Sequence, residues 1–192
     1  SEIGTELAEV KGTSLLSSDN QCSLPELADW GLTRMLKEIR DDLGRIGVEF
    51  DVWFSERSLY DGDVYGHVMK ELRSRGYLTD REGATWFASR NLGEDKDNVL
   101  IRRTGAPTYF ASDAAYHYDK FLIRGFEHVV NIWGADHQGH ISRLKAILLA
   151  LDVDPNRLTV LVSQMVMLRR QGEVVRVSKR TGEIIMLRDL VD

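Results

Sequence analysis

An aspartate and two histidines lie close together in the segment WGADHQGH, Trp133 to His140. Carboxylates and imidazoles are common zinc ligands, and His137 and His140 have the i, i+3 spacing of two ligands on one helix face. Asp136 would point elsewhere on a regular helix, and zinc needs a further convergent ligand. Three other candidate ligands have no ligand-like setting: His117, His128 and Cys22. We therefore expect no protein-held metal.

A basic loop, RVSKRTGE, is the second segment that could do chemistry. Lys179 could reach a polyphosphate, with Ser178 and backbone N–H groups as further donors, and Arg176 adds a second cation. A solvated basic turn is the alternative interpretation, and the loop's composition alone favours the turn.

Helices and strands alternate around these segments. Apolar residues spaced by three and four predict a helix that ends at Gly47, and VEFDVWF (48–54) alternates as a half-buried strand does. Asp61 is a candidate N-cap for a helix through about Arg75, stopped by Gly76. The first helix is defined by five residues: Leu32, Leu36, Ile39, Leu43 and Ile46.

Residues 77–110 have the pattern of an antiparallel β insertion. Two strand pairs are expected, one around the turn Glu82-Gly83 and one around Thr104-Gly105. The polar segment NLGEDKDN lies between them.

After Ala111 the alternation resumes. The pattern predicts a helix at 112–124, a strand at 128–133, a helix at 138–151, a strand at 158–164 and a hairpin at 166–177. Short apolar strands alternating with helices predict an α/β fold with a parallel sheet. Ligands of such folds bind beyond the carboxyl ends of the strands, where WGADHQGH and RVSKRTGE are expected.

The composition is that of a globular protein. The chain has 192 residues, 43% of them apolar, and a formal charge of −5, which gives no global attraction to nucleic acid. A single cysteine, Cys22, and the absence of a signal peptide or a long apolar run favour a soluble protein of the cytoplasm without a membrane segment. The chain starts at Ser1, inside a helical pattern, and stops without a cap, so we expect a piece of a longer protein.

Six segments, in their order and spacing, resemble the catalytic domain of arginyl-tRNA synthetases over about three quarters of the chain. They are GVEFDVWFSERSLYDGDV, RGYLTDREGATWFAS, DKDNVLIRRTGAPTYFASDAAYHYDKF, IRGFEHVVNIWGADHQGHISRLKA, QMVML and VSKRTGEIIMLRDL. The resemblance implies that residues 1–192 are the C-terminal part of a class I synthetase domain, with a Rossmann-type nucleotide-binding fold and the β insertion at about 77–110.

The resemblance also implies a pocket for L-arginine formed by Glu56, Tyr109 and Asp113, with His137 at its edge. Two carboxylates and a phenol hydroxyl can meet the planar, five-donor guanidinium with directional hydrogen bonds. Without the resemblance, an exposed acid, a strand-face aromatic and a helix N-cap would explain the first three residues better.

For ATP, the resemblance implies that Gly134 lets the ribose approach and that Asp136 accepts from its hydroxyls. The backbone near Met165 and Val166 would bind the adenine edge. His140 receives no role.

RVSKR resembles the K-M-S-K-S signature of class I synthetases, in which Ser178 and Lys179 match. The implied reaction joins arginine to the α-phosphate of ATP and then transfers the arginyl group to tRNA(Arg). Lys179, assisted by Arg176 and Ser178, would stabilise charge on the phosphates, and Mg²⁺ would enter with ATP, held mainly by phosphates and water.

HQGH spells the H-x-G-H pattern of the class I ATP signature, yet it lies in the wrong place. That signature follows the first strand of the fold, whereas only 35 residues separate His140 from Arg176. The true signature, the N-terminal part and the anticodon-binding domain, which make most of the tRNA contacts, are expected outside these residues. We expect a monomeric parent enzyme and no activity from the isolated chain.

Three other functions stay open. One is a class I synthetase for another amino acid, such as cysteine, and another is a non-catalytic paralogue that binds nucleotide or tRNA. The third is a metal hydrolase that uses Asp136, His137 and His140.

Overall fold

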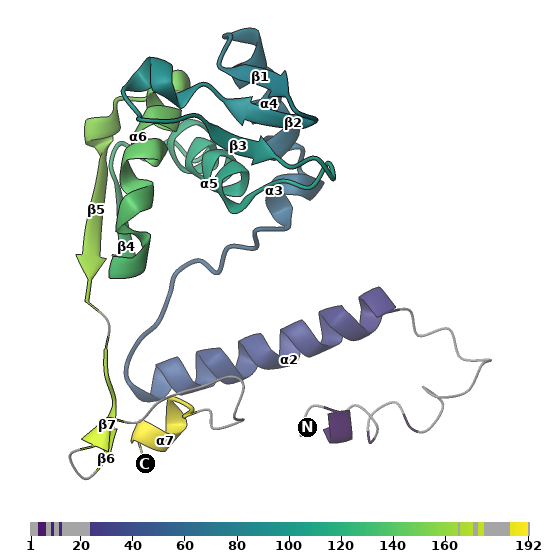
Figure 1. Ribbon diagram of the computed structural model, residues 1–192. Coiled ribbons are helices and arrows are strands. Elements are labelled where there is room, and N and C mark those ends of the chain that lie inside the picture. The colour runs from purple at the N-terminus through teal and green to yellow at the C-terminus, as the bar shows by residue number, and fades with distance from the viewer. Residues whose placement is uncertain are drawn as a thin grey trace. The chain divides into compact units, whose positions relative to one another are not determined.

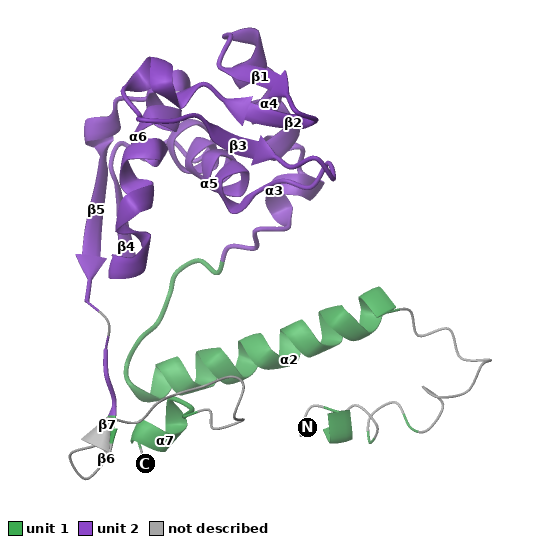
Figure 2. Ribbon diagram, viewed as in Figure 1, with its two compact units in different colours: residues 1–53, 169–192 green, residues 54–168 purple. Residues whose placement is uncertain are grey.

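The computed structural model describes residues 4–6, 9, 12, 24–164, 166–170, 173–174 and 185–191. These form two compact units, coloured separately in Figure 2. The first combines residues 1–53 with 169–192, and the second is the continuous segment 54–168. Each unit is described by itself.

The second unit contains the buried core and alternates helices with strands (Figure 1). Its helices α4, α5 and α6 surround a core that includes Phe87, Leu100, Leu144 and Ile147, all fully buried. The elements of the unit are α3 (Ser58–Asp61), α4 (Val64–Ser74), β1 (Leu78–Arg81), β2 (Ala84–Phe87), η2 (Ser89–Leu92), β3 (Asn98–Ile101), α5 (Tyr109–Tyr118), η3 (Asp119–Ile123), β4 (Val129–Gly134), η4 (Ala135–His140), α6 (Ile141–Ala150), η5 (Pro155–Arg157) and β5 (Leu158–Ser163).

Strands β4 and β5 run parallel, joined through η4, α6 and η5. Their register is continuous, from Val129 opposite Leu158 to Gly134 opposite Ser163. A parallel pair needs a crossover connection, and the apolar face of α6 is buried at Leu144, Ile147 and Leu148. The expected α/β alternation is therefore confirmed in this part of the chain.

The β insertion is an antiparallel meander in the order β1–β2–β3. The hairpin at Glu82-Gly83 is confirmed, because Arg81 pairs with Ala84 and the two turn residues have φ of 54° and 75°. Two successive positive φ angles define the type I′ turn, whose twist matches that of the strands.

The second predicted hairpin, around Thr104-Gly105, forms its turn, but the second of its two expected strands is not formed. β3 pairs with β2, and only the bridge Ile101–Pro107 remains of the pairing expected across Thr104-Gly105. The segment after Pro107 becomes helix α5, because the helix buries Phe110 in the core.

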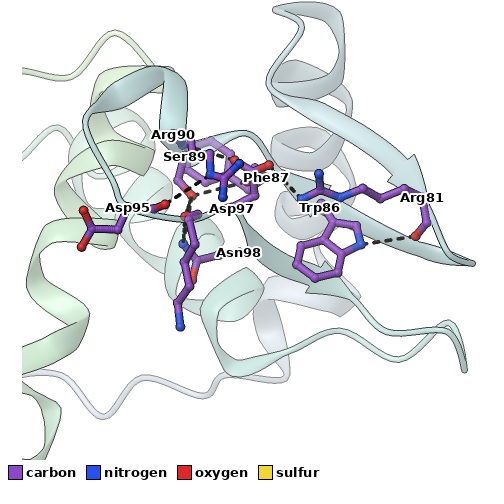
Figure 3. Close-up of polar contacts among 9 residues, drawn as sticks. Arg81, Trp86, Phe87, Ser89, Arg90, Asp95, Asp97 and Asn98 are labelled. Carbon is purple, nitrogen blue, oxygen red and sulfur yellow. Dashed lines mark hydrogen bonds and ion pairs between the residues drawn. The ribbon is translucent and has the colours of Figure 1, made fainter.

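Polar contacts close the loop between η2 and β3 (Figure 3). Asp97 accepts from the Arg81 guanidinium at 2.8 Å and from the Arg90 backbone N–H at 3.3 Å. Ser89 Oγ donates to the Lys96 carbonyl at 2.8 Å. The guanidinium of Arg81 also lies 4.4 Å from the centre of the Trp86 ring. The Asp97 carboxylate thus ties the loop to β1 and η2, and η2 packs against α6.

Helix α4 begins later than predicted. Asp61 ends the short helix α3, and the N-cap of α4 is Asp63, whose φ is 55° and whose side chain makes no capping hydrogen bond. The predicted stop at Gly76 is confirmed. Gly76 has φ of 79°, and the next backbone N–H, of Tyr77, donates to the Leu72 carbonyl at 2.9 Å.

The predicted helix at 112–124 is confirmed and begins at Tyr109, so Asp113 lies inside α5 and is not its N-cap. Its last part, η3, is a π-helix. There the backbone N–H of Arg124 donates five residues back, to the Asp119 carbonyl at 2.8 Å.

In the first unit the predicted amphipathic helix is confirmed as α2 (Leu24–Arg45), none of whose residues is buried. The strand predicted at 48–54 is wrong, because these residues pair with no strand among the described residues and leave Phe50 and Val52 exposed. The predicted hairpin at 166–177 is confirmed by the short strands β6 (Arg169–Arg170) and β7 (Glu173–Val174), and α7 spans Arg188–Val191. Over the described residues, every helix is too short or too polar to cross a membrane.

Candidate functional site

Two adjoining hollows in the second unit contain the predicted arginine-binding residues. The first hollow has a volume of about 280 Å³ and is lined by Phe54, Glu56, Leu59, Tyr109, Ser112, Asp113 and Tyr116. The second hollow, of about 300 Å³, is lined by Tyr109, Asp113, Trp133, His137, His140 and Arg143. Tyr109 and Asp113 line both, so the two hollows adjoin each other at these residues.

Helix α5 positions the two shared residues. Tyr109 and Asp113 are four residues apart and therefore lie on one face of the helix. The start of α5 is fixed to β3, because the Thr108 backbone N–H donates to the Leu100 carbonyl at 2.8 Å. Thr108 Oγ1 also donates to the Val99 carbonyl at 2.9 Å. Tyr109 is 82% exposed, so its hydroxyl is accessible to a ligand.

Glu56 lies in the turn before α3, and its side chain is exposed. Its carbonyl accepts from the Leu59 backbone N–H at 3.1 Å, and the Leu59 side chain is buried. The hydroxyls of Tyr60 and Ser112 are 2.6 Å apart and link α3 to α5. The backbone hydrogen bond, the buried Leu59 side chain and the Tyr60–Ser112 contact therefore fix the position of the Glu56 backbone relative to α5.

The first hollow concentrates negative charge. Burial raises the pKa of the Asp113 carboxyl, the positive charge of Arg143 opposes this rise, and the negative charge of Glu56 adds to it. A carboxylate whose pKa is raised by burial and by a neighbouring negative charge is stabilised in its charged form when a cation binds beside it. A planar cation such as a guanidinium would meet both carboxylates and the Tyr109 hydroxyl.

A buried histidine supports α5 behind the hollows. His117 Nδ1 lies 2.8 Å from the Asp113 carbonyl, which only accepts, so Nδ1 carries the proton. Nε2 therefore accepts from the Asn131 amide at 2.9 Å, which joins α5 to β4. Burial, with the nearby charge of Lys120, lowers the pKa of His117 to about 4. The imidazole is thus neutral at physiological pH.

Lys120 connects Asn131 to Tyr116, whose ring lines the first hollow. Its ammonium donates to Asn131 Oδ1 at 3.2 Å and lies 4.0 Å from the centre of the Tyr116 ring. That ring stacks on Phe54 with centroids 4.3 Å apart. Burial, with the charge of Arg124, lowers the pKa of Lys120 to about 8.

The second hollow contains imidazoles. The rings of His137 and His140 are 5.4 Å apart, and Trp133 lies edge-on to His137 at 6.4 Å. Burial, with the charge of Arg143, lowers the pKa of His140. No group of three or more metal-binding side chains forms within the described part of the chain.

Gly134 and Asp136 lie where β4 passes into η4. A Cβ on Gly134 would come within 2.6 Å of Asp136 Oδ1, so the carboxylate folds back over the glycine. Asp136 Oδ2 is 3.5 Å from His137 Nε2, and both side chains are largely exposed. The carboxylate is therefore free to accept from a ligand's hydroxyls.

Part of the predicted site lies outside the described residues: Met165, Arg176, Ser178 and Lys179. Val166 is described and is 82% exposed, beyond the end of β5.

Sequence reasoning missed four residues that the structure places around the hollows: His117, Lys120, Asn131 and Arg143. Helical spacing offered a signal for two of them, because His117 is four residues from Asp113 and Arg143 is three from His140. Asn131 offered none, since a polar residue in a short apolar strand is equally consistent with an exposed position.

Comparison with known proteins gives a consistent family. The model of the class I tRNA synthetases (R), catalytic domain, matches residues 17–192. The arginine–tRNA ligase of Dehalococcoides mccartyi is 51% identical over 191 residues, which is 100% of this chain and 34% of that protein. That of Caldanaerobacter subterraneus is 47% identical over 97% of this chain and 33% of its own length.

A solved structure from Campylobacter jejuni, described as a candidate arginyl-tRNA synthetase, superposes with a TM-score of 0.86 at 37% identity. The match covers 99% of this chain and 40% of that one. The chain therefore spans about a third of the length of the curated relatives it matches.

Proposed function

Because the chain belongs to the catalytic-domain family of the class I tRNA synthetases (R), we propose that its full-length protein is an arginine–tRNA ligase. Relatives that are 45–53% identical to this chain over the aligned residues carry that name. The family uses ATP. The protein would activate L-arginine with ATP to arginyl-adenylate and transfer the arginyl group to tRNA(Arg).

The observation that carries the proposal is the chemistry of the first hollow. Glu56 and Asp113 supply two carboxylates and Tyr109 a hydroxyl, around a space of about 280 Å³. Charge-assisted bonds from a guanidinium to these groups would distinguish arginine from uncharged analogues such as citrulline. The aromatic rings of Phe54 and Tyr116 offer flat walls for a planar cation.

The proposed reaction has two steps. The carboxylate of arginine attacks the α-phosphorus of ATP and pyrophosphate leaves. The 2′- or 3′-hydroxyl of the terminal tRNA adenosine then attacks the arginyl carbonyl and AMP leaves. Neither step needs a covalent protein nucleophile, so catalysis would come from positioning and from cations that stabilise the phosphates.

Residue roles for ATP follow from the family pattern. Gly134 and Asp136 would receive the ribose, and the backbone at Met165 and Val166 the adenine. The phosphates would meet three residues of the basic loop: Arg176, Ser178 and Lys179. Mg²⁺ would enter with ATP and be held mainly by phosphate oxygens and water, as this ion usually is at nucleotide sites. We propose a monomer that acts in the cytoplasm.

The other candidate functions have less support. A thiol substrate such as cysteine would leave the two carboxylates of the first hollow without a cation. The family and the names of the relatives do not favour a non-catalytic paralogue or a metal hydrolase.

Aminoacylation of tRNA by the full-length protein tests the proposal. Arginine should be the amino acid that is charged, and a Glu56→Gln variant should raise the KM for arginine on the order of tenfold or more, because a charge-assisted hydrogen bond is lost. Asp51→Asn is the matched control, since Asp51 is exposed and lies outside the hollow. Charging of a different amino acid, or an unchanged KM in Glu56→Gln, would refute the assignment.

A further inference from the structure

Arg143 is a half-buried cation that lacks an acceptor. Across the described segments it forms no hydrogen bond or ion pair, and its Nε atom is buried without a partner. Its guanidinium instead lies 4.9 Å from the centre of the Phe110 ring. An N–H donor that has lost water without gaining an acceptor is costly to the fold, and the rest of the guanidinium lines the second hollow, which points to a ligand that supplies acceptors.

The surroundings of Arg143 do not supply the missing anion. Asp113 and Glu94 are near enough to act on it electrostatically, and neither forms an ion pair with it. On the side of the hollow, its neighbours are the imidazoles of His137 and His140. The second hollow therefore presents the Arg143 guanidinium and two imidazoles, beside the Asp113 carboxylate at its border with the first hollow.

The two hollows differ in charge. Glu56 lines only the first and Arg143 with two histidines only the second, while Asp113 and Tyr109 line both. The carboxylates therefore lie toward the first hollow and the guanidinium of Arg143 lies in the second. The two hollows together suit a molecule with a cation at one end and an oxyanion at the other.

Free arginine has this distribution of charge. Its guanidinium carbon and its α-carbon are about 6 Å apart in the extended form, by ordinary bond lengths. A guanidinium placed in the second hollow would be repelled by Arg143, whereas a carboxylate there would be attracted, so the substrate is oriented with its carboxylate toward Arg143 and its guanidinium toward Glu56 and Asp113.

We propose that Arg143, flanked by His140, forms an oxyanion subsite in the second hollow that receives the carboxylate of the amino-acid substrate. The subsite rests on the proposed function. A phosphate of ATP offers the same chemistry, so the test must separate the two sources. In this role Arg143 directs the reacting carboxylate, and it also prevents binding of arginine in the reverse orientation.

The test compares arginine with agmatine, which keeps the guanidinium and lacks the carboxylate. In the full-length protein, Arg143→Gln should raise the KM for arginine on the order of tenfold or more. The inhibition constant of agmatine should stay within about twofold, because agmatine makes no bond to the subsite. Arg143→Lys, which keeps the charge, should recover part of the loss.

Lys145→Gln is the matched control, because Lys145 is a cation of the same helix that does not line the hollow. It should leave both constants unchanged. Equal weakening of arginine and agmatine by Arg143→Gln would overturn the inference, since it indicates a purely structural role. A rise in the KM for ATP alone would support the oxyanion subsite and assign it to a phosphate.

The two proposals fail in different ways. If the unaltered protein charges no tRNA with arginine, the proposed function is wrong. If it does so and Arg143→Gln changes neither KM, only the subsite is wrong.

Discussion

Asp113 makes two different kinds of contact. Its carboxylate lines both hollows, and its backbone carbonyl accepts the Nδ1 proton of His117. The imidazole then accepts from Asn131 on β4. A single buried ring therefore fixes the distance between the helix that carries the carboxylate and the strand that leads to Trp133.

The neutral state of His117 predicts a pH dependence of stability. Its pKa is about 4 in the fold against 6.5 for the free side chain, so the unfolded chain binds more protons between these values. The contribution is complete above pH 6.5 and is lost as the pH falls toward 4. Between pH 7 and pH 5 the free energy of unfolding should drop by about 2 kcal/mol from this group.

Urea unfolding at the two pH values, followed by circular dichroism, measures this drop. A His117→Gln variant should be less stable at pH 7 and should lose most of the difference between pH 7 and pH 5. His128→Gln is the control, because His128 is an exposed histidine that bonds Thr159. A His117→Gln variant with the same pH dependence as the unaltered chain would contradict the assignment.

At the level of elements, the turn of the first hairpin contains an unfavourable residue. Glu82 has φ of 54°, where a side chain with Cβ is strained and Asn is tolerated best. Its exposed ion pair with Arg103, at 3.4 Å, adds at most a few tenths of a kcal/mol. The strain therefore outweighs the ion pair.

Glu82→Asn should stabilise the fold by about 0.5–1 kcal/mol despite the loss of the ion pair. Arg103→Gln removes the same ion pair and leaves the turn unchanged, so its free energy of unfolding should stay within about 0.3 kcal/mol. Denaturant unfolding of both variants measures these effects. A lower free energy of unfolding in Glu82→Asn would show that the ion pair with Arg103 contributes more than the relief of backbone strain.

Element predictions succeeded where a local signal sufficed. The turn Glu82-Gly83, the stop at Gly76 and the apolar periodicity of α2 all depend on residues close in sequence. The strand predicted at 48–54 failed because alternation does not supply the neighbouring backbone that a strand must pair with. The second hairpin failed because burial of Phe110 favoured helix over a second ladder.

The residues of the candidate site also fall into two groups, those named from the sequence and those found only in the structure. Glu56, Tyr109, Asp113 and His137 were named through a family resemblance and lie together around the hollows. Asn131, Lys120 and Arg143 belong to β4, η3 and α6, which come together beside α5 only in the fold. A single sequence contains no direct record of such contacts.

For the whole molecule, the buried core belongs to the second unit. Its cluster of buried apolar residues extends from Val68 to Leu158, whereas no residue of α2 is buried. Local stability follows buried contacts, so the two units should differ in their opening free energies.

Hydrogen exchange of the 192-residue chain tests this difference. Backbone amides of α6, where Leu144 and Ile147 are fully buried, should exchange at least about a hundredfold more slowly than those of α2, after correction for intrinsic rates. Amides of α4, which carries the buried Leu72, serve as a second reference within the same unit. Equal protection of α2 and α6 would mean that unfolding is global and that the core stabilises both units alike.

The π-helix at Asp119–Ile123 affects tolerance of deletions. A π turn accommodates one residue more than an α turn, and each residue of an α-helix rotates the chain by about 100°. Deleting one residue after Lys120 would let the helix close as ordinary α, because the extra residue is the one that the wider turn accommodates. The side chains that follow would keep close to their present directions, and the segment leading into β4 would start from the same side of the helix. A one-residue deletion here should therefore leave His117 bonded to Asn131, whereas the same deletion between Asp113 and His117 would rotate the imidazole away from β4.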